Sequence, residues 1–180
     1  MEYIDILTPT GEFTGTCEER AVVHTQGLWH RTVHVWMRNA DGEILFQRRS
    51  STKETHPDLW DISCAGHLSA GDSSIEGAVR EAFEELGLVI DVSRLIYLFT
   101  MKQHWENPEK TIIENEIKDV YLYDFSIDEN KIKIDPAEVS GFRFISIQKF
   151  ENEIITNIDQ FVPHEEEYGR LLAYLKGDCI

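Results

Sequence analysis

Between residues 74 and 86, hydrophobic side chains recur with the period of an α-helix. At about 100° per residue, they gather on one face that we expect to pack against the core: Ile75, Val79, Ala82, Phe83 and Leu86. A serine followed three residues later by a glutamate, Ser73 and Glu76, is typical of a capping box at a helix start. Gly87 is typical of a helix end. The pattern therefore predicts one amphipathic helix here.

Shorter runs rich in β-branched and aromatic side chains predict strands. They lie at residues 32–37, 43–47, 59–65, 95–102, 117–125 and 142–147. The N-terminal residues alternate around a Pro-Thr-Gly turn, which predicts a hairpin over about 1–20. Residues 104–111 are polar and predict a loop, and residues 148–152 predict a short helix. Apolar positions at helical spacing predict a C-terminal helix over about 164–176.

Interleaved strands, hairpins and helices favour an α/β fold with a mixed sheet over a purely parallel one. The chain has 180 residues, which is enough for one sizeable core and short for two. No stretch rich in proline, glycine or serine divides it. We therefore expect residues 1–180 to form a single domain.

The charge balance restricts the partners of the protein. A formal net charge of −16 argues against nucleic acid or an anionic membrane as the main partner. The sequence has no long apolar run and no basic-then-apolar leader, so it predicts neither membrane insertion nor secretion. The three cysteines are widely spaced without a Cys-x-x-Cys motif, which suits a reducing compartment. We expect a cytoplasmic protein.

The polar face of the predicted helix carries three carboxylates, on Glu81, Glu84 and Glu85. Like charges at these spacings repel one another, so the arrangement costs stability unless solvent or a cation compensates it. Hard divalent cations prefer carboxylate oxygens, so Mg²⁺, with Mn²⁺ as a substitute, is the cofactor that this face predicts. The competing interpretation is an ordinary solvated acidic face.

The surroundings of these carboxylates resemble the Nudix box, the signature of the Nudix hydrolase family. In that motif a glycine, an arginine-glutamate pair, a glutamate pair and a final glycine recur at fixed spacing. Eight residues match it: Gly66, Arg80, Glu81, Ala82, Glu84, Glu85, Gly87 and Leu88. One position departs from it, because Asp72 stands where the family has a glutamate, and its side chain is shorter.

This resemblance implies a fold, an activity and a set of site residues. The fold would be the α/β/α sandwich of the family, with a mixed β-sheet and a loop-helix-loop catalytic motif. Glu81, Glu84 and Glu85 would be catalytic metal ligands, and Arg80 would orient the glutamates. The backbone at Gly66 would lie close to the metal.

Arg48, Arg49 and Lys53 form the one compact basic group of the sequence. A diphosphate requires such donors, and arginine is suited to bidentate contacts with phosphate oxygens. Solubility of an edge strand is the other explanation. Because the Nudix-like box follows shortly afterwards, we interpret the group as the binding site for a small-molecule diphosphate substrate.

The chain also resembles type I isopentenyl diphosphate isomerase, a relative built on the same fold. The resemblance is carried by two histidines, a tryptophan with an Ala-Gly-His turn, and a Glu-Asn-Glu: His24, His30, Trp60, residues 65–67 and residues 114–116. Arg49 and Lys53 also match diphosphate-binding positions of that enzyme. The resemblance implies a second metal site made of His24, His30, His67, Glu114 and Glu116. The alternative is that these histidines are structural.

Two features oppose isomerase chemistry. The catalytic cysteine position of the isomerases is Ala65 here, and Cys64 should point to the other face because side chains alternate along a strand. The isomerases also replace several glutamates of the box, whereas Glu81, Glu84 and Glu85 are present.

The leading hypothesis is therefore a metal-dependent Nudix hydrolase, in which water attacks the diphosphate linkage of a nucleoside diphosphate derivative or a related organic diphosphate. Glu116 is the first choice for a further ligand or general base, Glu114 the second and Glu138 the third. Two alternatives stay open: an isomerase-like enzyme that uses Cys64, and a non-catalytic regulator that binds a diphosphate or nucleotide. The sequence leaves the oligomeric state open, a homodimer included.

Overall fold

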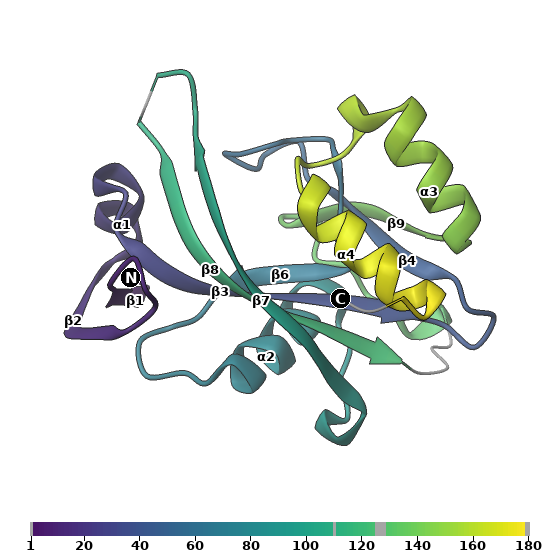
Figure 1. The fold of residues 1–180 in the computed structure, drawn as a ribbon, viewed down its shortest axis with the longest axis horizontal. Coiled ribbons are helices and arrows are strands. Elements are labelled where there is room, and N and C mark those ends of the chain that lie inside the picture. The colour runs from purple at the N-terminus through teal and green to yellow at the C-terminus, as the bar shows by residue number, and fades with distance from the viewer. Residues whose placement is uncertain (1, 110, 125–128, 179–180) are drawn as a thin grey trace.

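The computed structural model describes residues 2–109, 111–124 and 129–178 (Figure 1). Nine strands of these residues join one sheet. The strands are β1 (Tyr3–Leu7), β2 (Phe13–Glu19), β3 (Trp29–Arg38), β4 (Ile44–Arg49), β5 (Trp60–Asp61), β6 (Cys64–His67), β7 (Leu95–Glu106), β8 (Ile113–Asp124) and β9 (Val139–Ile145). The helices are α1 (Arg20–Gln26), α2 (Ser74–Leu86), α3 (Ile147–Thr156) and α4 (Glu165–Lys176), with short 3₁₀ turns η1 (Val92–Arg94), η2 (Glu129–Lys131) and η3 (Ile158–Gln160).

Strand β3 lies at the centre of the sheet and uses both of its edges. One edge runs parallel to β8, from Trp29 opposite Asn115 to Arg38 opposite Asp124. The other edge is antiparallel and is divided among three strands, β1, β6 and β4. The sheet is therefore mixed, as the sequence predicts.

Helices cover both faces of the sheet (Figure 1). Side chains alternate along β3, so Val33 and Val35 pack with Ala82 and Leu86 of α2. Trp36 points to the opposite face and packs with residues of α3 and α4: Phe150, Tyr168, Leu171 and Leu172. This arrangement confirms the predicted α/β/α layers.

Helix α2 begins and ends as the sequence predicts. The Ser73 hydroxyl and the Glu76 side chain form a reciprocal capping box. Gly87 ends the helix in the left-handed conformation, with φ of 66°.

Among the helices of the described residues, none combines the length and the hydropathy that a membrane-spanning helix requires.

The predicted strand over residues 59–65 is wrong, because the chain changes partner within it. Strand β5 pairs with β4, whereas β6 pairs with β3. Between them, the Ser63 hydroxyl accepts a hydrogen bond from the Met37 amide at 2.8 Å and donates one to the Leu45 carbonyl at 2.6 Å. The hydroxyl thus bridges β3 and β4 just beyond the point where their backbones pair.

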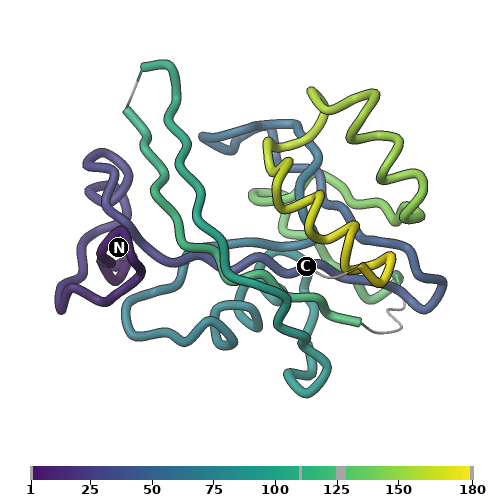
Figure 2. The backbone as a smooth tube through the Cα atoms, viewed as in Figure 1, coloured from purple at the N-terminus to yellow at the C-terminus, as the bar shows by residue number. Residues whose placement is uncertain are grey.

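The predicted loop over residues 104–111 is shorter than expected. Strand β7 continues to Glu106 and β8 begins at Ile113, so the two strands form a long hairpin. Figure 2 shows this hairpin standing beside α1 on one side and beside the loop at residues 50–59 on the other. The hairpin and this loop are in contact, because the ring centroids of Trp105 in β7 and His56 in the loop lie 4.8 Å apart. Phe125, the predicted end of the next strand, lies outside the described residues.

Candidate metal and diphosphate site

Helix α2 packs on the sheet with only part of the face that was expected. Val79, Ala82 and Leu86 pack with the core as predicted. Glu81 and Glu85 belong to its buried face. Ile75 and Phe83, which were expected in the core, are 46% and 59% exposed. At Gly77 the absence of a side chain lets the helix approach the sheet closely. The expected packing face is wrong at Ile75 and Phe83, because the helix turns Glu81 and Glu85 toward the sheet instead. Glu85 finds hydrogen-bond donors there, and Glu81 accepts from the adjacent Arg80.

Glu85 is held from two sides. Its Oε2 accepts a hydrogen bond from the Gln47 side-chain amide at 2.9 Å and another from the backbone amide of Ala65 at 3.1 Å. Burial, followed by the nearby charge of Glu81, raises the pKa of Glu85 to about 8. A buried carboxylate of this kind favours either a proton or a cation beside it.

Glu81 lies directly against the backbone of Gly66. A β-carbon on Gly66 would stand 2.1 Å from the Glu81 carboxyl carbon, so this contact requires glycine. The Arg80 guanidinium donates to Glu81 Oε1 at 2.5 Å. Burial nevertheless raises the pKa of Glu81 to about 7.

Arg80 connects the box residues to one another. It donates to the His67 carbonyl at 2.7 Å, and its guanidinium lies 3.6 Å from both Asp72 and Glu84. The Glu84 side chain is 55% exposed, so it is the solvent-facing member of the three glutamates. Arg80 therefore has the contacts expected of a residue that orients the carboxylates.

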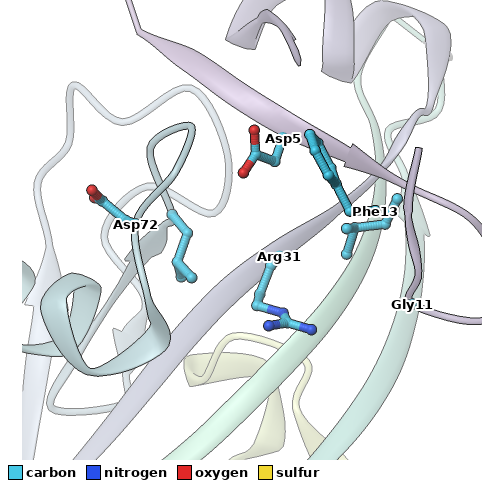
Figure 3. Close-up of a pocket in the computed structure, with 7 residues that line it drawn as sticks. Asp5, Gly11, Phe13, Arg31 and Asp72 are labelled. Carbon is cyan, nitrogen blue, oxygen red and sulfur yellow. The ribbon is translucent and has the colours of Figure 1, made fainter. Parts of the chain in front are cut away.

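Asp72 also lines a pocket between the N-terminal hairpin and the loop before α2. Figure 3 shows Asp5, Phe13 and Arg31 around this pocket. Arg31 Nε lies 3.7 Å from Asp119 Oδ2. The residue that departs from the box motif therefore stands between Arg80 and this pocket.

The three histidines of the isomerase-like pattern form one cluster. Their ligand atoms all lie within 4.8 Å of one another, and the Nε2 atoms of His24 and His67 are 3.0 Å apart. His30 is buried, its Nδ1 contacts the Leu28 carbonyl at 2.9 Å, and its Nε2 has no hydrogen-bond partner. Burial lowers the pKa of His24 to about 4 and that of His67 well below the ordinary value. Three imidazole nitrogens that converge in this way, one of them without a hydrogen-bond partner, fit a divalent cation.

Helix α1, which the hydrophobic pattern did not predict, brings His24 to this cluster. It ends at Gly27, which has φ of 61° and whose carbonyl accepts a hydrogen bond from the Asn115 side chain at 2.7 Å. The middle residue of the Glu-Asn-Glu run thus fixes the helix to β8. A seven-residue helix is too short to give a clear periodic signal.

Glu116 faces the cluster from β8, with its Oε1 3.9 Å from His30 Nε2. Burial opposes its ionisation, but the charge of Lys118, helped by the histidines, outweighs burial and holds its pKa at about 2. Burial and the charge of Glu116 raise the pKa of Glu114 to about 7. A cation at the histidines would therefore find one ionised carboxylate and a second nearby. The two predicted metal sites meet at β6, because Gly66 contacts Glu81 and His67 contacts His24.

The basic group is tied to protein partners. Arg49 lies 3.0 Å from the Asp61 carboxylate and also donates to the Thr55 carbonyl. Lys53 forms an ion pair with Glu138. Arg48 is exposed, and its Nε donates to the Asp58 carbonyl at 3.1 Å. A bound phosphate would either accept further hydrogen bonds from these side chains or displace their present partners. Glu138, the third candidate for a general base, is already paired with Lys53.

Cys64 and Ala65 point to opposite faces of β6. Cys64 is buried in the core beneath α2, and Ala65 packs with the core beneath α3 and α4. Burial and the charges of Glu85 and Glu81 raise the pKa of the Cys64 thiol well above its ordinary value. The thiol is therefore neutral and is not on the Ala65 side of the strand.

The structure also brings polar residues to the site that the sequence did not single out. They are Gln47 beside Glu85, Lys118 beside Glu116, and Asp61 beside Arg49. None of them lies at a fixed spacing within a motif. Asp61 follows Trp60 of the isomerase-like run, and this proximity is the one signal that pointed toward it.

The family model of the NUDIX domain matches residues 28–166. Nudix hydrolase 3 of Arabidopsis thaliana is 35% identical over an alignment that covers 99% of this chain and 24% of that protein. The chain thus spans about a quarter of the length of that relative. An isopentenyl-diphosphate Delta-isomerase of Pectobacterium atrosepticum is 28% identical, over 82% of this chain and 78% of that enzyme.

The fold is similar to the crystal structure of DR0079 from Deinococcus radiodurans. The two superpose with a TM-score of 0.72 at 21% identity, over 98% of each chain. The resemblance of residues 66–88 to the Nudix box is thus accompanied by a match over most of the chain and by the same arrangement of layers. The protein belongs to the NUDIX-domain family, in the branch that resembles isopentenyl-diphosphate isomerase.

Proposed function

We propose that this protein is a divalent-metal-dependent hydrolase that cleaves the diphosphate linkage of a nucleoside diphosphate derivative or a related organic diphosphate. One observation carries the proposal: Glu81 and Glu85 are buried side by side against β6, with pKa values raised to about 7 and about 8. Two carboxylates kept in such surroundings cost stability unless a cation compensates them. Family membership gives this site its expected chemistry.

The residues of the box would hold Mg²⁺ or Mn²⁺ through Glu81, Glu84 and Glu85, next to the Gly66 backbone. The metal would neutralise charge on the phosphates and activate the attacking water. Arg80 orients Glu81 through its 2.5 Å hydrogen bond. Gln47 and the Ala65 amide orient Glu85.

Substrate phosphates would be bound by the basic group. Arg49 is the main candidate because its guanidinium is already oriented by Asp61 and Thr55. Lys53 would exchange its ion pair with Glu138 for a phosphate oxygen, and exposed Arg48 would contribute long-range attraction. Glu116, with Glu114 as its neighbour, would be a ligand of the second metal or the general base.

The experiment is a panel of diphosphate-linked compounds incubated with Mg²⁺ or Mn²⁺, with products followed by mass spectrometry. The panel includes isopentenyl diphosphate and nucleoside diphosphate derivatives. Cleavage that disappears in Glu85→Gln supports the hydrolase. Full activity of a purified, folded Glu85→Gln variant would overturn the hydrolase. If no compound of the panel is converted with either metal, a binding protein is favoured instead.

A second candidate is an isomerase acting on isopentenyl diphosphate or a related organic diphosphate. It is favoured by the convergence of His24, His30 and His67 beside Glu116, and by the similarity to isopentenyl-diphosphate Delta-isomerase. It is opposed by Ala65, which leaves no thiol on that side of β6, and by the intact box. A mass-neutral conversion of isopentenyl diphosphate, detected by chromatography, would place it ahead of the hydrolase.

A further inference from the structure

A buried row of polar side chains runs between the histidine cluster and the basic group. It consists of Lys118 from β8, His164 just before α4, and Asp61 from β5. Their side chains are only 1%, 9% and 4% exposed. Neither the proposed metal ligands nor the proposed phosphate ligands include them, so burial of three polar groups here requires its own explanation.

The row connects the two ends of the site. Lys118 Nζ lies 3.4 Å from Glu116 Oε2 at one end. At the other end, Asp61 Oδ2 lies 3.0 Å from Arg49 Nη1. His164 joins them, with its Nδ1 3.4 Å from Lys118 Nζ and its Nε2 3.3 Å from Asp61 Oδ1. Opposite charges alternate from Glu116 to Arg49, and the neutral ring of His164 lies between the Lys118 ammonium and the Asp61 carboxylate.

The chemistry of the neighbours fixes the proton of His164. An ammonium can only donate, so His164 Nδ1 accepts from Lys118, and the ring proton lies on Nε2, where it is donated to Asp61. Burial and the charge of Lys118 both lower the pKa of His164, which agrees with a neutral ring.

The ring of His164 is also held in place from the side. Its centroid lies 5.2 Å from that of His34 and 5.9 Å from that of Tyr168. His34 contacts Glu167 at 2.9 Å, and the Tyr168 hydroxyl donates to the Val162 carbonyl at 2.7 Å. A side chain locked by such contacts transmits position to the groups that it touches.

We infer that His164 is a positioning residue, which fixes Glu116 through Lys118 and Arg49 through Asp61 in one shared geometry. The inference rests on the proposed function in that Glu116 is taken as a metal ligand and Arg49 as a phosphate ligand. It adds that metal affinity and phosphate affinity depend on a side chain that touches neither ligand.

Two variants of His164 separate positioning from packing. In His164→Gln, the amide oxygen can accept from Lys118 and the amide nitrogen can donate to Asp61, so both links are retained. In His164→Leu, both links are lost and Lys118 and Asp61 are left without that partner. Both variants are tested at a temperature well below their own melting temperatures.

Two binding measurements are made on the full chain without turnover. Co²⁺ titration followed by visible absorption reports the imidazole-rich site, and calorimetric titration with inorganic pyrophosphate in Mg²⁺ reports the basic group. We expect His164→Leu to weaken Co²⁺ and pyrophosphate binding by about 10–100-fold each, as loss of a residue that orients a ligand does. His164→Gln should restore most of both affinities.

The inference is overturned if His164→Leu binds both probes as wild type does, or if the two variants lose affinity equally. It is also overturned if wild type binds no Co²⁺ at the histidines. Failure of the proposed function gives a different result, namely no cleavage of any diphosphate in the panel while both binding effects of His164→Leu persist.

Discussion

Gly66 and Glu81 approach so closely that a β-carbon on the glycine would stand 2.1 Å from the glutamate carboxyl carbon. The obstructing atoms belong to the end of a flexible side chain, so Gly66→Ala should fold and displace the Glu81 carboxylate. A misplacement of about 1 Å at a reacting centre costs about 100-fold in rate. We expect kcat/KM for the cleaved diphosphate to fall by about that factor, with little change in Tm.

The matched control for this variant is Gly169→Ala in α4. A β-carbon there would meet nothing within 4 Å, and alanine in a helix stabilises by about 0.5–1 kcal/mol relative to glycine. Activity should be unchanged in this control. If Gly66→Ala remains as active as the control, the carboxylate of Glu81 is not needed where it stands.

Glu85→Gln should be inactive and yet more stable than wild type in the absence of divalent cations. The pKa of Glu85 in the folded protein, about 8, lies above the ordinary value of about 4.3 in an unfolded chain. The contribution of Glu85 to the stability of the wild type therefore falls as pH rises from about 4.5 to 8. The glutamine side chain of the variant does not titrate, so the variant does not lose this stability. We expect a difference of roughly 1–3 kcal/mol at pH 8 in chelator, measured by urea unfolding.

Added Mg²⁺ supplies the complementary test. It should stabilise wild type and have a much smaller effect on Glu85→Gln, because binding to the folded state raises its stability. Equal stabilisation of the two proteins would show that Mg²⁺ binds without the Glu85 carboxylate.

Glu167 should make the fold sensitive to acid. This buried carboxylate accepts a hydrogen bond from Trp36 Nε1 at 2.8 Å and contacts His34 Nδ1 at 2.9 Å. Burial opposes ionisation, but the charge of His34 and this contact hold the pKa of Glu167 at about 2. Because the folded pKa lies below the unfolded one, its stabilising effect is present above about pH 4.5 and is lost as pH falls toward 2.

The measurement compares urea unfolding of wild type and Glu167→Gln at several values between pH 6 and pH 2.5. The difference in their free energies of unfolding should narrow by at most about 3 kcal/mol as pH falls. Parallel curves for the two proteins would mean that Glu167 does not titrate in this range.

Cys64→Ala should leave diphosphate cleavage close to wild type and lower stability by about 1 kcal/mol, because a buried thiol is replaced by a smaller side chain. The cysteine lies beneath α2 with a raised pKa, so it supplies no thiolate near neutral pH. Loss of activity in a folded Cys64→Ala variant would instead support isomerase-type chemistry. Turnover and thermal unfolding of the same preparation distinguish the two results.

The elements whose signals are local could be predicted from the sequence. The capping box at Ser73 and the left-handed Gly87 define the ends of α2 within its own residues. The buried face of that helix could not be predicted from periodicity alone, because burial of its glutamates depends on residues elsewhere in the chain. Glu85 accepts from Gln47 and from the Ala65 amide, and Glu81 fits against Gly66. The break between β5 and β6 likewise depends on Ser63 bridging two other strands.

The candidate site divides in the same way. Its motif residues could be located by spacing, and the three histidines come together as that pattern implies. Lys118, His164 and Asp61 could not be located, since they belong to separate elements and have no spacing in common. The three side chains come together only in the folded protein, where β8 places Lys118 on one side of His164 and β5 places Asp61 on the other.

The divided edge of β3 has a consequence for the order in which a growing chain can assemble. β1, β4 and β6 can join one edge of β3 soon after residue 67 has been made, but the other edge waits for β8, which ends at Asp124. Until then the three histidines have been synthesised without Glu116, and His30 has an open strand edge beside it. While the ribosome translates β7 and β8, a nascent chain is therefore open to premature binding of imidazole-preferring ions such as Zn²⁺, or to pairing of the β3 edge with another strand.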